Sequence, residues 1–166
     1  MSRTPVVCLF ALVASLAACA PRVAPLAHTA SSPEALASAV LAALAAGDRE
    51  TLVGLALSES EFRDYVWPDL PAARPERNLP FSYVWGDLHQ KSEASLAVTL
   101  DAMRGRRQEL VEVRFGEVTP YATYTVHRQA RFTVRGADGT TEDVAVCGSF
   151  LERDGRWKVF SYVTGD

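Results

Sequence analysis

The segment ERDGRWKVFSY, residues 152–162, carries the clearest structural pattern of the chain. Asp154-Gly155 is a strong signal for a two-residue β-hairpin turn, because both residues tolerate the positive φ angles that such a turn needs. After the turn, Trp157 and Val159 alternate with polar residues, which is typical of a strand with one buried face. The segment therefore predicts the last hairpin of an antiparallel sheet.

Alternating segments earlier in the chain extend this sheet. Apolar and polar residues alternate at 111–115, 124–134 and 144–150. Ala137-Asp138-Gly139 supplies a three-residue hairpin turn between the last two of these segments. Together with the strand that begins at Trp157, they predict a four-stranded antiparallel meander.

The first half of the chain shows helical caps instead. Ser32, Asp48 and Ser58 each stand where a helix begins, and Gly47 ends the first helix. Four prolines between positions 68 and 80 predict a loop. A helical pattern then resumes up to Gly105, with an expected interruption near residue 90. Helices followed by an antiparallel sheet define an α+β domain, which we place at residues 32–166.

The overall composition limits the range of functions. The chain has 166 residues, of which 48% are apolar, and this is enough for one globular domain with its own core. Its 17 basic and 20 acidic side chains give a formal charge of −3. This balance provides no large basic surface, so we expect no nucleic acid partner.

The N-terminus has the architecture of a signal peptide at residues 1–18. A short, weakly positive start precedes an apolar run that is too short to span a bilayer. The run ends in Leu16-Ala17-Ala18-Cys19, which resembles the lipobox of bacterial lipoproteins. The resemblance implies cleavage before Cys19 and lipid attachment to its thiol, with an Ala- and Pro-rich tether at residues 19–31. The alternative is an ordinary secretory signal cut after Ala18 or Ala20.

The location follows from the same resemblance. Ala20 follows the cysteine where an aspartate would mark retention, so we expect a lipid-anchored protein of the bacterial cell envelope, at the outer membrane and facing the periplasm. The cysteines agree with this expectation. Cys8 leaves with the signal peptide and Cys19 carries lipid, so Cys147 is left without a disulfide partner and is expected to be a buried packing residue.

The layout of residues 32–166 resembles the nuclear transport factor 2-like superfamily. The motif at 152–159, ending in Gly155-Arg156-Trp157-Lys158-Val159, and Ala45-Ala46-Gly47-Asp48 after the first helix are habitual features of that superfamily. The resemblance implies a cone-like fold in which a curved sheet wraps N-terminal helices. Some members are isomerases, dehydratases or cyclases that carry out acid–base chemistry in the cone, but their catalytic residues have no counterparts here, so we assign no catalytic residue.

Strand registers inferred from the turns predict a candidate pocket. They place Arg128, Gly148 and Ser161 in one row across an otherwise apolar sheet face, with Glu109 next to Arg128. Gly148 and Ser161 would leave space there, and the Arg128 guanidinium would bind a small amphipathic or anionic ligand. The alternatives are a simple Arg–Glu pair at the rim or a different register.

Three aromatic residues flank the proline loop. Trp67, Tyr83 and Trp85 are expected to close one end of the fold, or else to line its mouth. No group of His, Cys and carboxylate residues has metal-ligand spacing, and no nucleotide-binding motif is present. We therefore expect neither a metal nor a cofactor.

The expected function is thus non-catalytic. The domain would bind a small ligand, or dock to another envelope protein or to a second copy of itself. The alternative is an isomerase-, dehydratase- or cyclase-type acid–base enzyme. An enclosed cavity that holds a titratable residue with a displaced pKa would favour the enzyme, and a cavity without such a residue would favour ligand binding. A filled core with an apolar patch on the outside would favour docking.

Overall fold

The computed structural model describes residues 24–164 of the chain. The predicted signal peptide, residues 1–18, and the predicted lipid site, Cys19, lie outside the described residues. Helices come first and strands follow, so the predicted α+β class is confirmed. The helices are α1 (Pro33–Ala46), α2 (Arg49–Leu55), α3 (Glu59–Glu61) and α4 (Phe81–Met103), and four short turns lie between α3 and α4: η1 (Phe62–Val66), η2 (Trp67–Asp69), η3 (Pro71–Ala73) and η4 (Pro75–Arg77).

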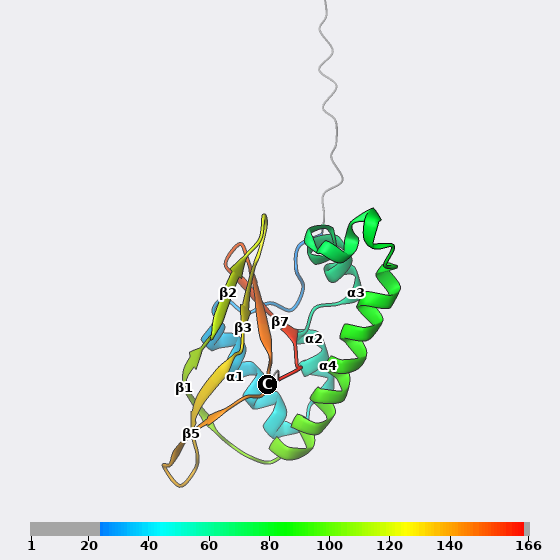
Figure 1. Ribbon diagram of the computed structural model, residues 1–166. Coiled ribbons are helices and arrows are strands. Elements are labelled where there is room, and N and C mark those ends of the chain that lie inside the picture. The colour runs from blue at the N-terminus through cyan, green and yellow to red at the C-terminus, as the bar shows by residue number, and fades with distance from the viewer. Residues whose placement is uncertain (1–23, 165–166) are drawn as a thin grey trace, which may run out of the picture.

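Within residues 24–164, seven strands form two antiparallel sheets. One sheet has the order β1-β4-β5 and the other has the order β2-β3-β6-β7. Helix α1 contacts strands β1 and β7 as well as α4, and so lies between the strands and α4 (Figure 1). The strands are β1 (Glu109–Arg114), β2 (Glu117–Pro120), β3 (Thr125–Arg128), β4 (Arg131–Arg135), β5 (Thr141–Val144), β6 (Ser149–Arg153) and β7 (Arg156–Ser161).

The three predicted helix caps are confirmed. The Ser32 side chain accepts a hydrogen bond from a backbone N–H of the first turn of α1, and Asp48 does the same for α2. Ser58 and Glu61 form a complete capping box at α3. Gly47 ends α1 with a φ of 72°, in the left-handed region that glycine adopts without strain. Local hydrogen bonding therefore fixes these helix boundaries, and the sequence alone reveals them.

The predicted interruption of the helix near residue 90 is wrong. Helix α4 runs without interruption for 23 residues through the break expected near residue 90. The polar residues that suggested a break lie largely on its exposed side, where Lys91 pairs with Asp87 at 2.8 Å. Ser92 faces the other way, and its Oγ accepts a hydrogen bond from the backbone N–H of Tyr162 at 3.0 Å. Packing against the C-terminal end of the chain thus holds this stretch in the helix.

The predicted four-stranded meander is also corrected, because its long strands are bent and divided between the two sheets. One bend lies between β1 and β2 at Gly116, where an added Cβ atom would stand 2.0 Å from the Oε1 atom of Gln129. Gln129 itself has a φ of 54° and separates β3 from β4. The Gln129 side chain therefore packs over the glycine at this bend, and a larger residue at position 116 would displace it.

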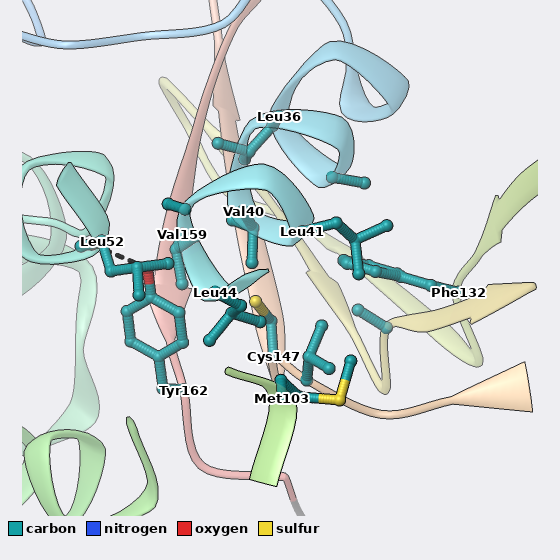
Figure 2. Close-up of a cluster of buried hydrophobic side chains, with 14 of the residues drawn as sticks. Leu36, Val40, Leu41, Leu44, Leu52, Met103, Phe132, Cys147, Val159 and Tyr162 are labelled. Atoms are coloured by element: carbon teal, nitrogen blue, oxygen red, sulfur yellow. Dashed lines mark hydrogen bonds between the residues drawn. The ribbon is translucent and has the colours of Figure 1, made fainter. Parts of the chain in front are cut away.

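Two hydrophobic clusters fill the domain. The first joins α1, α2 and the end of α4 to both sheets, and Figure 2 shows part of it. Cys147 is 1% exposed within this cluster, so its predicted role as a packing residue is confirmed. Burial raises the pKa of its thiol. The second cluster lies on the other face of the four-stranded sheet and consists of Leu57, Phe62, Tyr65, Val66, Tyr124, Val126 and Leu151.

Candidate functional site

The predicted pocket row is wrong in register. Two of the predicted strand pairs are observed: Phe132 lies opposite Val144, and Phe150 lies opposite Val159. Beyond them the strands shift by one residue, so Arg128 lies opposite Ser149 and not opposite Gly148. The shift at Arg128 arises where Gln129 separates β3 from β4, opposite the irregular stretch between β5 and β6. A separate bulge between Ser149 and Phe150 places Ser161 opposite Ser149.

The three predicted ligand-binding residues do not come together. Arg128 is exposed and pairs in register with Glu117 of β2. Glu109 lies in the other sheet, opposite Arg135, with 3.6 Å between its carboxylate and the Arg135 guanidinium. Ser161 is buried, and its Oγ accepts a hydrogen bond from the backbone N–H of Val163 at 3.0 Å.

The chain itself fills the space that was predicted for a ligand. A Cβ atom added to Gly148 would lie 1.7 Å from the backbone carbonyl oxygen of Val163. The Gly148 N–H also donates to the Ser161 carbonyl at 2.9 Å. Gly148 is therefore required for the close approach of the C-terminal segment and does not form the floor of a pocket.

A buried ion pair occupies the other face of the same sheet. The ammonium group of Lys158 in β7 lies 2.8 and 3.1 Å from the two carboxylate oxygens of Glu61. Lys158 is 2% exposed and Glu61 is 8% exposed. The same carboxylate accepts hydrogen bonds from the backbone N–H groups of Ala27 and Ser58, both at 2.8 Å. A buried charge is tolerable only with this degree of pairing, so the arrangement is a structural lock in which three donor groups make four hydrogen bonds to one carboxylate.

The electrostatics of Glu61 agree with this role. Burial disfavours the charged carboxylate, but the hydrogen bond from Lys158 and those from the two backbone N–H groups outweigh it. The net effect holds the pKa of Glu61 below its usual value of 4.5. Glu61 is therefore an ionised acceptor in the folded protein at neutral pH.

Residues 24–31 form a strap that is fastened to the domain, although the sequence predicts them as part of the tether. The Tyr65 hydroxyl donates to the carbonyl of Ala24, and Ala27 donates to Glu61. Ala30 pairs with Trp157 through two backbone hydrogen bonds of 3.0 Å each. The part of the predicted tether at residues 24–31 is thus fastened to the domain, and the rest of the predicted tether, residues 19–23, lies outside the described residues.

No local pattern in the sequence indicates the lock or the strap. Lys158 stands between two apolar residues of an alternating strand, so the pattern predicts a solvent-exposed side chain. It is buried because helical turns cover the second face of the sheet. Glu61 is visible in the sequence only as the last residue of a capping box. The pairing of two residues that are 97 positions apart depends on tertiary packing, which local patterns do not encode.

Several hollows lie along the described residues. A narrow one has a volume of about 30 Å³ and lies between α2, α4 and β7, next to His89, Ser92 and Tyr162. This volume holds about one water molecule. A wider groove of about 670 Å³ runs along α1, and another of about 630 Å³ lies beside the strap, lined by Tyr65 and Arg153 among others. Both are open to the surface.

Within residues 24–164, no three His, Cys, Asp or Glu side chains are grouped so that they would hold a metal ion. No helix in the same range has the length and apolarity needed to cross a membrane. Comparison of the chain with protein families, with curated proteins and with solved structures gives no match.

Proposed function

We propose that this is a lipid-anchored protein of the bacterial cell envelope whose domain works without catalysis, by docking to another protein through its surface. The sequence Leu16-Ala17-Ala18-Cys19 supports the anchor, since it has the form of a lipobox at the end of an apolar run. The anchor holds the protein at the outer membrane, facing the periplasm. The partner is another envelope protein or a second copy of this chain.

The filled interior is the observation that carries the non-catalytic function. An acid–base enzyme of the isomerase, dehydratase or cyclase type needs an enclosed cavity large enough for its substrate. The enclosed cavity near His89 has titratable neighbours but room for about one water molecule. The space predicted beside Gly148 is taken by Val163. These features favour a surface function over an enzyme or a carrier of small ligands.

We also propose that the domain is a cone-like member of the nuclear transport factor 2-like superfamily. The helices-first order, the antiparallel pairing and the bends at Gly116 and Gln129 support a curved sheet. The hairpin at Asp154-Gly155 matches the motif on which the resemblance rests.

Native mass spectrometry of the mature chain without lipid tests the non-catalytic function. The expected result is the bare mass of a monomer or dimer, because the hollow near His89 is too small for a ligand and Val163 takes the space beside Gly148. A small molecule that remains bound under gentle conditions would contradict the proposal, and its identity would distinguish a carrier from an enzyme.

The anchor is tested by Cys19→Ser expressed in a bacterium that processes lipoproteins. We expect this variant to leave the membrane fraction, because the serine hydroxyl cannot replace the thiol in lipid attachment and a mature chain without acyl groups has no lasting hold on the bilayer. Cys8→Ser is the matched control: its thiol lies inside the predicted signal peptide, so this variant should stay with the membrane. A Cys19→Ser protein that remains membrane-bound would exclude the anchor.

A further inference from the structure

We propose that the end of the domain formed by residues 67–83 lies against the bilayer, with Leu79 and Tyr83 in the headgroup layer. This inference rests on the proposed anchoring at Cys19. It assigns a membrane-facing surface to a domain whose attachment would otherwise allow any orientation. The strap, the shape of the molecule and the side chains at this end each support it.

The strap limits how far the domain can stand from its anchor. Five residue steps separate Cys19 from Ala24, and a fully extended chain of this length spans at most about 18 Å. The carbonyl of Ala24 accepts a hydrogen bond from the hydroxyl of Tyr65, and Tyr65 comes immediately before the proline-rich turns in the sequence. A lipid at Cys19 therefore keeps this part of the domain close to the membrane surface.

The shape of the molecule places residues 67–80 at the same end as the strap. Figure 1 shows the beginning of the described chain, in blue, beside α3 and the turns that follow it, whereas the C-terminal end of α4 lies at the opposite end. Leu26 of the strap packs in the second cluster together with Trp67 and Leu70. The proline-rich turns are thus the part of the domain next to the point of attachment.

The side chains at this end suit a membrane interface. Tyr83 is 66% exposed and Leu79 is 41% exposed, and the exposed Arg74 and Arg77 lie in the preceding turns. Tyrosine and arginine combine an apolar body with a polar tip, which is the chemistry of the headgroup region. Glu76 and other acidic residues offset the arginines, so we expect apolar contact rather than net charge to hold this surface to lipid.

The base beneath these side chains is firmly packed. The rings of Trp67 and Phe81 meet edge to face at 5.6 Å, and the Arg63 guanidinium lies 4.4 Å above the Phe81 ring. Trp85 packs on Phe62 at 5.3 Å. The sequence predicts that Trp67 and Trp85 close one end of the fold, and both pack into the second cluster there. Tyr83 differs because it projects outward from this packed base.

Photo-crosslinking to lipid tests the orientation. The mature chain is coupled through its Cys19 thiol to a maleimide phospholipid in vesicles of phosphatidylethanolamine and phosphatidylglycerol. Cys147 is buried and does not compete for the maleimide. Benzoylphenylalanine replaces Tyr83 in one variant and Val98 in the other. Val98 is the matched control because it is 72% exposed on the same helix, about 22 Å farther along its axis.

We expect lipid adducts at position 83 to exceed those at position 98 by about tenfold, because the offset along α4 is larger than the thickness of a headgroup layer. Equal yields, a higher yield at 98, or no adduct at 83 would overturn the proposed surface. The chemical coupling replaces natural lipidation in this experiment. A negative crosslinking result therefore contradicts only the proposed orientation. An error in the proposed natural anchor would appear instead in the membrane fractionation of Cys19→Ser.

Discussion

Lys158→Met is expected to lower the free energy of unfolding by about 3–5 kcal/mol, the usual cost of removing one partner from a buried ion pair. The loss arises because Glu61 remains buried and ionised without its cation. Chemical denaturation at neutral pH measures the change. Lys91→Met is the matched control, since Lys91 is the other lysine of the chain and its pair with Asp87 is exposed. The control should leave the stability unchanged.

The pH dependence gives this prediction a second readout. The folded-state pKa of Glu61 lies below the usual value of 4.5, so its contribution to stability is complete above that pH and is lost as pH falls through the folded-state pKa. The stability difference between the wild type and Lys158→Met should therefore narrow on acidification below about pH 4.5. A difference that is small at neutral pH, or that does not change with pH, would contradict the lock.

Gly148→Ala is expected to cost about 3 kcal/mol, at the upper end of what overpacking costs in a dense core. The new methyl group would meet the Val163 carbonyl, a backbone group that moves only if the C-terminal segment is displaced. Loss of that segment would also disturb Tyr162, which donates from its hydroxyl to the Leu52 carbonyl at 2.7 Å (Figure 2). The midpoint of thermal or chemical unfolding measures the effect.

Gly86→Ala is the matched control for this substitution. A Cβ atom at Gly86 has no heavy atom within 4 Å, and the residue lies inside α4. Alanine should raise the stability there by about 0.5–1 kcal/mol because it restricts the unfolded chain and favours the helix. If both variants behaved alike, the close approach of Val163 to Gly148 would be wrong.

The features that the sequence predicted correctly are set by neighbouring residues. The side chains of Ser32, Asp48 and Ser58 cap helices within their own first turns, and Asp154-Gly155 closes its own hairpin. Such contacts involve residues only a few positions apart, so their pattern is visible in one sequence. The α+β order of elements follows directly from them.

The candidate site could not be predicted in the same way. The row of Arg128 with Gly148 assumes unbroken strands, but the bend at Gln129 and the shift before Phe150 change the register by one residue. A shift of this kind alters which side chains are neighbours across the sheet. The burial of Lys158 and the docking of the strap depend on contacts far apart in the sequence, so no local pattern reveals them.

Residues 24–31, which follow the predicted anchor site, belong to the folded domain. Amide hydrogen exchange of the mature chain tests this at Ala27, which donates to Glu61, and at Ala30, which donates to Trp157. The expected result is protection at both amides that is lost together with the lock in Lys158→Met. Exchange at the rate of an unstructured peptide in the wild type would show instead that residues 24–31 are a free tether and would contradict the claim.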